Sequence, residues 1–495
     1  MAQSAFHRLL GGFAFYSVAL FTYALLFFLS IRNGSFFREA SEKDENDLAL
    51  ERDRYWNLSK QPFPGFDHHF HTLRNGRKLH YVCNKEQKPQ SGNLMILIHG
   101  FPDSFVLWKG LLQEPAVPLT EATWVAVDLP GYGGSDSFDK YDVAVLEALA
   151  EFIVAMRDTF LTIDGDGVPQ ASTYIVAHDW GAVLSFRLAS EAPSLADRFI
   201  LTNGPHVALS FANRDRIAHS SEKIFKQFRR SPWQNFGCLG KSLKALSPLF
   251  IQALMFGYIA SFHLPVQMVK YLGTGGNLAF IRGCHSVQRG SKKIELYIAE
   301  ALAGTLGPGP QECKVTSAQA TNGSNQGYGE SVLQRAKSPA IAFWHQTCYY
   351  RDGASYKPWT KSLETIADLY ALDSAASESS SPARRRSSSS ASSGLFTPQI
   401  TGLLHAPATV LWGLKDRACG KQICLDGMGD YLAKDSEIVL LPRSGHWTPL
   451  EPDSRVALAR VVGMYAESQE NAVARASVTK FVGEVYEGAV QVTKK

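Results

Sequence analysis

The chain has 495 residues, of which 45% are hydrophobic and 19% charged, so it is long enough for two or three folded domains with a buried core. Its formal net charge of +4 is small for this length and gives no reason to expect nucleic-acid binding. The seven cysteines are odd in number and include no CxxC pair, which argues against a structural zinc site and a fully paired disulfide framework.

The first predicted element is an apolar helix at residues 9–31, which are uncharged. At about 1.5 Å per residue the stretch is long enough to cross a hydrocarbon core of about 30 Å. A signal peptide is the alternative, but its apolar core would be only roughly 7–15 residues long and would precede a cleavage site of small residues. We therefore expect residues 1–32 to be a single-pass membrane anchor in contact with lipid.

The orientation of this anchor follows from its flanking charges. Arg8 precedes the apolar stretch, whereas Arg32, Arg38 and Lys43 follow it. Because positive charge is retained on the cytosolic side of a membrane, this bias favours a cytosolic body. We expect the membrane to be that of the endoplasmic reticulum, and the charged residues 33–60 to form a flexible linker.

Short apolar segments separated by helical patterns begin after residue 60. Residues 70–73 and 78–82 flank the turn sequence RNGR and predict a β-hairpin. Further strands are predicted at residues 94–98, 124–127, 173–176, 199–201, 409–412 and 438–441. Almost continuously apolar strands that alternate with helices predict an α/β fold with a buried, mostly parallel central sheet.

The distance between residues 201 and 409 is too long for a single crossover and predicts an inserted domain. We assign the sheet domain to residues 61–206 and 396–470, a mainly helical cap to residues 207–395, and a C-terminal tail to residues 471–495. Two cap segments are expected to be disordered surface loops, near residues 307–331, rich in Gly, Gln, Asn and Ser, and 373–394, dominated by serine.

A second uncharged stretch, at residues 245–269 of the cap, is a candidate for another membrane span. It contains Pro248, Gln252 and His263, which would be costly facing lipid. We therefore expect a buried helix followed by a turn that ends at Pro265.

The sequence AHDWG at residues 177–181 lies between a predicted strand and a helical pattern. This arrangement predicts a nucleophile elbow, a sharp turn whose neighbours must be small, as Ala177 and Gly181 are. Asp179 takes the position at which serine hydrolases carry serine. A carboxylate nucleophile attacks carbon and leaves an ester on the enzyme, which water must then hydrolyse with help from a base.

Two more candidate catalytic residues follow predicted strands. Asp416 lies after the 409–412 strand, and His446 lies after the last one. The chain order nucleophile, acid, histidine is that of α/β-hydrolases, in which loops at the carboxyl ends of parallel strands meet over the sheet. Asp416 would orient the imidazole of His446, and His446 would deprotonate the attacking water.

The loop His99-Gly100-Phe101-Pro102 follows the 94–98 strand. Its Phe101 amide, together with that of Trp180, would form an oxyanion hole for the intermediate of ester hydrolysis. The glycine-rich segment at residues 128–136 lacks the spacing of a phosphate-binding loop, and we interpret it as a tight structural turn.

Together, the motifs HGFPDS, DLPGYGGSD, AHDWGA and GHW closely resemble those of the epoxide hydrolase family of α/β-hydrolases, over roughly residues 61–467. The resemblance implies two cap tyrosines that donate hydrogen bonds to the epoxide oxygen. Tyr258 matches the first and Tyr350 the second, with Tyr349 as an adjacent alternative. It further implies that a lipophilic epoxide and water give a vicinal diol through an ester on Asp179, without a metal or cofactor.

Three other functions remain open at this point. A haloalkane dehalogenase would use the same aspartate and histidine, with Trp180 helping to hold halide, but the tyrosine pair favours an epoxide. A serine esterase is disfavoured by Asp179. A membrane-held ligand-binding protein that has lost turnover would keep the same fold. The sequence does not indicate an oligomeric state.

Overall fold

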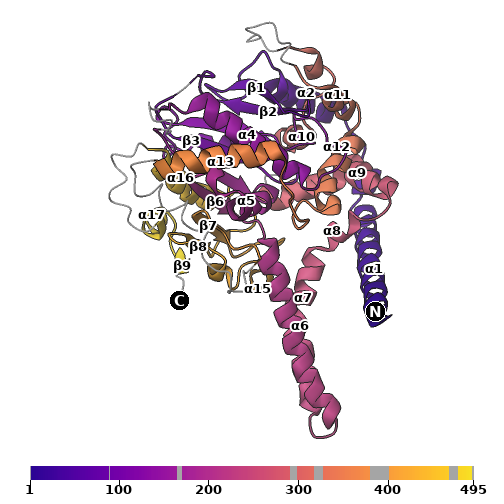
Figure 1. Ribbon diagram of the computed structural model, residues 1–495. Helices are drawn as coiled ribbons and strands as arrows, with labels where there is room; N and C mark the ends of the chain where they lie inside the picture. Colours follow the sequence, from indigo (N-terminus) through magenta and orange to yellow (C-terminus); the bar gives the residue numbers. More distant parts are fainter. Residues whose placement is uncertain are drawn as a thin grey trace.

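The computed structural model describes residues 2–88, 90–163, 170–289, 298–316, 327–378, 401–467 and 478–492. These residues include a nine-stranded sheet of order β1-β2-β4-β3-β5-β6-β7-β8-β9 (Figure 1). The strands are β1 (Asp67–Thr72), β2 (Lys78–Cys83), β3 (Leu94–Ile98), β4 (Thr123–Val127), β5 (Thr173–His178), β6 (Arg198–Thr202), β7 (Ala408–Gly413), β8 (Glu437–Leu441) and β9 (Val490–Val492).

The strands from β4 through β8 in this order are parallel, whereas β1, β2 and β9 are antiparallel to their neighbours at the two edges. The predicted hairpin and all six predicted core strands are present at their expected places. The expectation of a mostly parallel α/β sheet is therefore confirmed.

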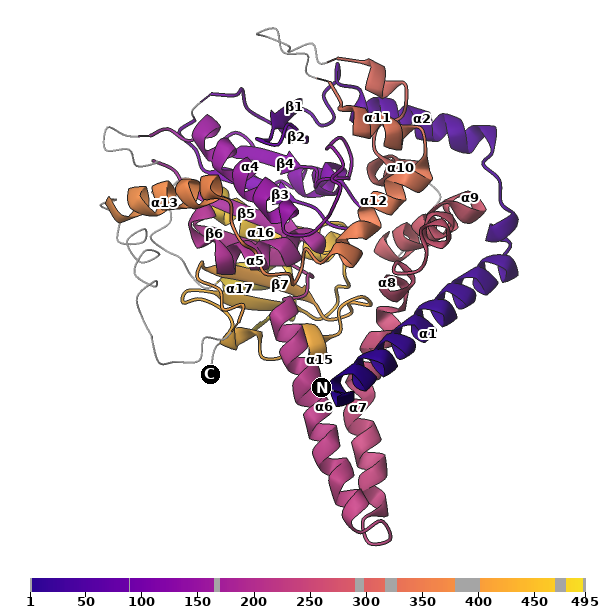
Figure 2. The same cartoon turned by 45° about the vertical axis from the view of Figure 1, so that its right-hand side comes forward.

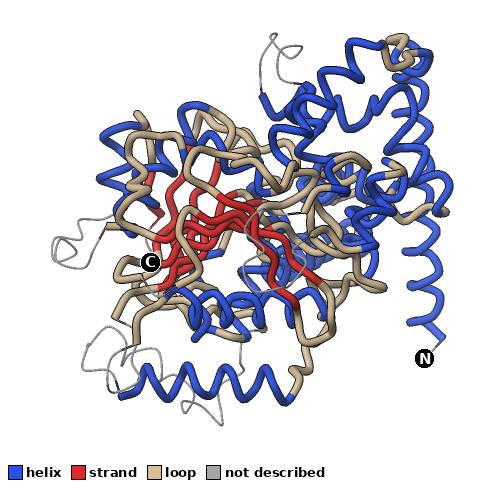
Figure 3. Tube along the Cα trace, turned by 90° about the horizontal axis from the view of Figure 1, so that it is seen from above, coloured by secondary structure: helices blue, strands red, loops and turns tan. Residues whose placement is uncertain are grey.

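Helices flank the sheet on both sides (Figure 3). Leu94, Ile96 and Ile98 of β3 belong to one apolar core, with α4 (Ala144–Phe160) and α5 (Trp180–Glu191), while Met95 and Leu97 belong to a second core. The second core includes α3 (Lys109–Leu112), α16 (Pro452–Ala466) and α17 (Val478–Val485). Because successive side chains of a strand point to opposite faces, only strands that are apolar throughout can serve both cores.

The segment between β6 and β7 is mainly helical, as predicted. Its helices are α6 (Val207–Arg230), α7 (Phe236–Met255), α8 (Gly257–Ser261), α9 (Val266–Arg289), α10 (Ile298–Leu306), α11 (Glu330–Ala336), α12 (Pro339–Asp352) and α13 (Leu363–Glu378). The last of these packs against α4 and the short helix η3 (Pro193–Leu195) of the sheet domain. The chain therefore returns to the side of the sheet before residue 395, the predicted end of the cap.

Helices α6 and α7 form a long hairpin that projects from the body (Figure 2). Phe250 of α7 is 73% exposed, and Leu243, Ile251 and Leu254 are exposed as well. The expectation that residues 245–269 begin with a buried helix is therefore wrong. The physical reason is that α6 covers only one side of α7, so the opposite apolar side has no neighbour among the described residues.

The N-terminal helix α1 (Ala2–Arg32) leaves the body on the same side as this hairpin (Figures 1 and 2). Its part Gly11–Arg32 is the one helix in the described ranges that is long and apolar enough to cross a membrane, with a mean hydropathy of 2.0 and only 6% of the segment buried. A signal sequence near the N-terminus passes the same test of helix length and hydropathy.

The predicted flexible linker at residues 33–60 is wrong for most of its length. The short helix η1 (Ser35–Phe37) is followed by α2 (Glu42–Trp56). Ser41 and Asp44 form a reciprocal capping box at the start of α2, and the final residues Tyr55 and Trp56 are completely buried. The two buried rings attach α2 to the rest of the molecule. The many charged residues of this segment had instead favoured the prediction of a flexible linker.

Other differences concern the predicted tail and loops. Within residues 471–495, α17 packs on α16 and β9 extends the sheet beside β8, so this part belongs to the sheet domain. At the ends of the loop predicted near 307–331, Gly307 accepts a hydrogen bond from Arg52, and the Tyr328 hydroxyl donates to Trp56. Residues 317–326 and 379–400, which include part of the first predicted loop and most of the second, lie outside the described residues.

Candidate active site

Asp179 occupies a sharp turn between β5 and α5, as expected for a nucleophile elbow. Its backbone has φ 50° and ψ −117°, a conformation that non-glycine residues rarely adopt. The turn requires close packing of the chain that follows it, because a Cβ on Gly181 would lie 2.2 Å from the carbonyl oxygen of Ile98. The predicted need for a small residue at position 181 thus has a direct steric cause.

The Asp179 carboxylate has two polar neighbours. The Phe101 amide donates a hydrogen bond of 2.7 Å to Oδ1, and His446 Nε2 lies 3.4 Å from Oδ2. Burial raises the pKa of Asp179, but the charge and hydrogen bond of His446, with the Phe101 amide, outweigh it and hold the pKa below its usual range. The carboxylate is therefore ionised at neutral pH.

Gly100 brings both predicted oxyanion-hole amides to the same place. A Cβ at this position would lie 2.4 Å from Asp179 Oδ1 and 2.6 Å from the amide nitrogen of Trp180. The Gly100 backbone therefore touches the nucleophile turn, with the Phe101 amide beside it. Phe101 and Pro102 are joined by a cis peptide bond.

His446 lies between two carboxylates. Its Nδ1 is 2.8 Å from Asp416 Oδ2, while its Nε2 faces Asp179. Burial lowers the pKa of His446, but the two carboxylates outweigh it and raise the pKa to about 10. The imidazole is therefore protonated at rest, and it can accept a proton only after one of the two negative charges has been removed.

Asp416 is fixed by backbone amides as well as by His446. Its Oδ1 accepts hydrogen bonds from the amides of Ala418 at 2.7 Å and Cys419 at 2.8 Å. These bonds orient Oδ2 toward His446. The structure thus brings Asp179, Asp416 and His446 into one continuous chain of contacts, in the arrangement expected from their positions after β5, β7 and β8.

Asn203, immediately after β6, is a site residue that the sequence reasoning missed. Its Nδ2 donates to Asp416 Oδ2 at 2.8 Å, and its Oδ1 accepts from the Thr448 hydroxyl at 2.7 Å. Its φ of 43° lies in the left-handed region, which asparagine tolerates better than most residues. The sequence Asn-Gly after a predicted strand was the available signal, because that strand ends at the same edge of the sheet.

Tyr258 on α8 and Tyr350 on α12 line the same cavity as Asp179. Burial and nearby negative charge hold the pKa of both hydroxyls well above the usual value, so both remain protonated donors. The Tyr350 ring packs edge-on against Trp180, with ring centroids 4.9 Å apart. Arg351, the next residue, donates hydrogen bonds to the carbonyls of Phe262 and Leu264 and so joins α12 to the end of α8.

Tyr349 has a different environment from its neighbour. Its ring is completely buried, and its hydroxyl donates to the carbonyl oxygen of Pro130 at 2.8 Å. It is not among the residues that line the cavity. Of the two adjacent tyrosines, Tyr350 is therefore the one placed to meet a ligand.

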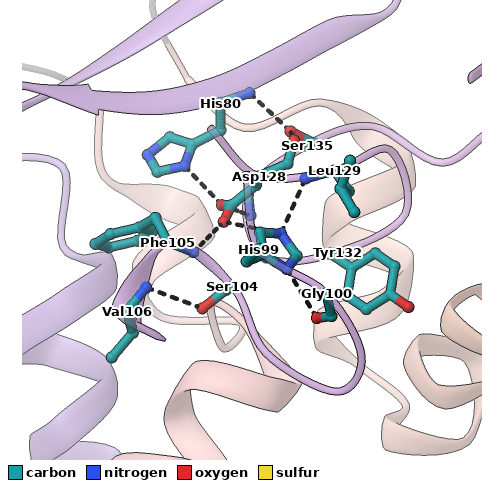
Figure 4. Close-up of polar contacts among 12 residues, drawn as sticks. His80, His99, Gly100, Ser104, Phe105, Val106, Asp128, Leu129, Tyr132 and Ser135 are labelled. Carbon is teal, nitrogen blue, oxygen red and sulfur yellow. Dashed lines mark hydrogen bonds and ion pairs between the residues drawn. The ribbon is translucent and has the colours of Figure 1, made fainter. Parts of the chain in front are cut away.

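His99 belongs to a buried polar network beneath the site (Figure 4). It accepts a hydrogen bond from the Leu129 amide on Nε2 at 3.0 Å, so Nδ1 carries the proton that reaches the Gly100 carbonyl at 2.9 Å. In the same network Asp128 contacts His80 and the Phe105 amide, each at 2.8 Å. The loops after β3 and β4 are thereby locked together, in agreement with a structural turn at residues 128–136.

The cavity that contains Asp179 has a volume of about 1100 Å³. This is at the upper end of the range for small-molecule sites. Its walls are mostly apolar and aromatic, and they include Phe101, Pro102, Tyr258, Leu272, Phe280, Tyr350 and Trp447. Such a site fits a large lipophilic molecule that presents a polar group to Asp179.

One set of potential metal ligands lies at this site. Asp416, Cys419 and His446 offer atoms within 4.8 Å of one another. Both oxygens of the Asp416 carboxylate are already engaged in hydrogen bonds, Oδ1 with the amides of Ala418 and Cys419 and Oδ2 with Asn203 Nδ2 and His446 Nδ1. The Asp416–His446 contact is therefore a hydrogen bond between catalytic candidates.

The chain is similar to known proteins over part of its length. The sequence matches the α/β-hydrolase fold family over residues 93–293. It is similar to epoxide hydrolase 3 of Mus musculus, with 32% identity over 151 residues that cover 29% of this chain and 37% of the relative. It is also similar to epoxide hydrolase 1 of Caenorhabditis elegans, with 30% identity over 223 residues that cover 45% of this chain and 46% of the relative.

The chain thus spans less than half the length of these curated relatives. Among solved structures, an epoxide hydrolase from Bacillus megaterium in complex with an inhibitor is similar at 20% identity and a TM-score of 0.42, covering 80% of this chain and 99% of that one. The match over residues 93–293 includes β3, β4, β5 and β6 and the Asp179 turn. Over residues 93–293 the chain therefore matches the α/β-hydrolase fold family, and parts of its sequence are similar to epoxide hydrolases.

Proposed function

We propose that the protein hydrolyses lipophilic epoxides to vicinal diols through a covalent ester on Asp179. The observation that carries the proposal is the presence of an ionised carboxylate and two protonated tyrosine hydroxyls, those of Tyr258 and Tyr350, on one largely apolar cavity. An epoxide needs both groups, because its carbon accepts a nucleophile while its oxygen gains negative charge. The names of the curated relatives support the same reaction.

In the first step, an Asp179 carboxylate oxygen bonds to a ring carbon, and the bond from that carbon to the epoxide oxygen breaks. The electron pair remains on the oxygen, which takes a hydrogen bond and then a proton from Tyr258 or Tyr350. A halide leaving group needs no such proton, so the tyrosine pair favours an epoxide over a haloalkane.

In the second step, water hydrolyses the ester. Esterification makes Asp179 neutral and so removes one of the two negative charges that raise the pKa of His446. The pKa of His446 therefore falls, and the imidazolium gives its Nε2 proton, through water, to the tyrosinate left by the first step. The neutral imidazole then takes a proton from the attacking water, while Asp416 continues to hold Nδ1–H. The amides of Phe101 and Trp180 would stabilise the oxyanion, and collapse of the intermediate expels the alkoxide, which takes the carboxyl proton, so that the carboxylate is restored and the diol is released.

A single-turnover reaction in ¹⁸O-labelled water tests this proposal. The ester route transfers an oxygen of Asp179 to the diol, so the first diol formed should be unlabelled and the label should appear in the peptide that contains Asp179. Label in the diol from the first turnover would overturn the covalent route. Halide release from haloalkanes, with epoxides left intact, would assign the site to dehalogenation instead.

We also propose that α1 anchors the protein in a membrane, with the catalytic body on the cytosolic side of the endoplasmic reticulum. The length and hydropathy of α1 and the basic residues that follow it support this arrangement. Alkaline carbonate extraction should leave the full chain in the membrane, and protease added to intact microsomes should digest the body. Release by carbonate, or protection of the body, would contradict the corresponding part of the proposal.

A further inference from the structure

Helix α1 packs closely against α8, the short helix that carries Tyr258. Ala19 is completely buried in this contact, and the Ser261 hydroxyl donates to its carbonyl oxygen at 3.1 Å. Gly257 faces Thr22 so closely that a Cβ at position 257 would lie 2.6 Å from the threonine hydroxyl oxygen. Small residues of this kind let helices approach each other within a membrane. Because Gly257 immediately precedes Tyr258, α1 is in contact with the candidate site itself.

The C-terminal half of α1 also forms part of the cavity wall. Tyr23, Leu26 and Phe27 line the same cavity as Asp179, together with Tyr271 and other residues of α9. The rings of Phe27 and Tyr271 lie 6.3 Å apart, which joins the two helices across this wall. Helix α1 is therefore more than a tether, since it supplies apolar surface to the pocket in which the proposed reaction takes place.

Another side of α1 faces away from the cavity. Phe21 is 64% exposed and Phe28 is 59% exposed, and neither lines the cavity. Phe250 and Leu254 of α7 are likewise exposed, on a hairpin that leaves the body on the same side as α1 (Figure 2). Exposed apolar side chains thus occur on both α1 and α7, which leave the body on the same side, as expected where a protein contacts acyl chains.

We propose that long-chain aliphatic epoxides dissolved in the bilayer pass directly into the cavity along α1, and that Leu26 and Phe27 set the preference for chain length. The inference rests on the proposed function and adds a substrate class to it. If α1 spans the membrane, the wall that it forms lies at the depth of the acyl chains. A substrate tail can then move from lipid to protein without crossing water. Transfer of the tail into water would be disfavoured about fourfold for each methylene.

The first test uses the full chain in phosphatidylcholine vesicles and the ratio of kcat/KM for 1,2-epoxyhexadecane to that for 1,2-epoxybutane. Leu26→Trp fills the wall on the cavity side, whereas Phe28→Trp places the same ring on the outer side as a matched control. Leu26→Trp should lower the ratio about tenfold, and Phe28→Trp should leave it within twofold of the parent. An unchanged ratio in Leu26→Trp, or an equal loss in both variants, would overturn the inference.

The second test does not depend on turnover. Asp179→Ala protein in the same vesicles is irradiated with an aliphatic epoxide that carries a diazirine at the end of its tail, and the labelled peptides are mapped by mass spectrometry. Label within residues 23–30 is expected, and it should decrease in the Asp179→Ala protein that also carries Leu26→Trp. Label confined to other segments would overturn the inference. If α1 is labelled but the parent enzyme forms no diol, the proposed function fails and the inferred wall stands.

Discussion

Replacement of His446 by glutamine should separate the two proposed chemical steps. Glutamine has a similar size but cannot take a proton from water, and a general base typically contributes about 10²–10⁴-fold. Ester hydrolysis should therefore slow by about that factor. Ester formation requires ionised Asp179 and the tyrosine hydroxyls, all of which remain, so the alkylated enzyme should accumulate.

The size of the charge effect follows from the geometry. At the observed distance of 3.4 Å between Asp179 Oδ2 and His446 Nε2, two unit charges attract each other by about 5 kcal/mol at an effective dielectric constant of about 20. The rise in the pKa of His446 from 6.5 to about 10 corresponds to a similar energy, about 5 kcal/mol, shared between two carboxylates after the cost of burial. The imidazolium is therefore a large part of what keeps Asp179 ionised.

The charge interaction between Asp179 and His446 predicts how the rate of ester formation depends on pH in the parent and in the variant. In the parent, the pKa of Asp179 is below its usual range, so ester formation should be independent of pH above about pH 5. In His446→Gln the cation is lost while burial remains, so the pKa of Asp179 rises. Ester formation in the variant should then increase with pH across the mildly acidic range.

Rapid mixing followed by mass spectrometry of the intact protein measures both steps. The variant should gain the mass of one epoxide within the time of a parent turnover and lose it about 10²–10⁴-fold more slowly. His219→Gln, on the exposed surface of α6, is the matched control and should behave as the parent. Unmodified His446→Gln protein, or diol formation within tenfold of the parent rate, would refute the reasoning.

Four further substitutions have distinct expected results. Tyr350→Phe should slow ester formation by about 10²-fold in stopped-flow assays and leave the free energy of unfolding unchanged. Tyr349→Phe should instead lower the free energy of unfolding by about 1–2 kcal/mol, because the buried carbonyl of Pro130 loses its donor. Equal losses of rate in the two variants would contradict this distinction. Gly181→Ala should cost at least about 2 kcal/mol in chemical denaturation, since its Cβ would meet a β3 carbonyl oxygen at 2.2 Å, and parental stability would refute that reading. Asn203→Ala should lower kcat about tenfold and shift the acid limb of the pH profile for ester hydrolysis to higher pH. The reason is that Asp416 would lose the hydrogen bond from Asn203 and would then stabilise protonated His446 more strongly. An unchanged acid limb would assign Asn203 a structural role alone.

Local patterns in the sequence were sufficient to predict the sheet and the chain order of the candidate triad. Each of the six strands from β3 to β8 is a short, mostly apolar run, and both Asp416 and His446 follow such runs closely. Adjacent parallel strands end at one edge of a sheet, so residues that follow β5, β7 and β8 meet there although they are far apart in the chain. The prediction that the three candidate residues lie close together depends only on the order and direction of the strands. Both are expected for an α/β-hydrolase fold.

Features that depend on distant contacts were not predictable in this way. Trp56 is buried because its indole donates to the carbonyl of Ala303, a residue 247 positions away, at 2.8 Å. The exposure of Phe250 depends on how many helices pack around α7, which the periodicity of α7 does not reveal. The contact of α1 with Gly257 likewise joins a segment that precedes the sheet domain in the sequence to a segment of the cap, which follows the first part of that domain.

Helix α2 has a practical consequence for the preparation of a shortened form of the protein that lacks α1. Besides the Trp56 bond, the Tyr55 hydroxyl donates to Glu300 Oε1 at 2.6 Å, so α2 fastens the cap helix α10 to the sheet domain. A truncated chain that begins at Ser41 keeps the two hydrogen bonds between α2 and α10, together with the capping residue of α2. Truncation at residue 57, a natural choice if the whole N-terminal region were taken as dispensable, would remove both hydrogen bonds to α10 and uncover the rings of Phe63 and Phe105 that pack against Tyr55 and Trp56.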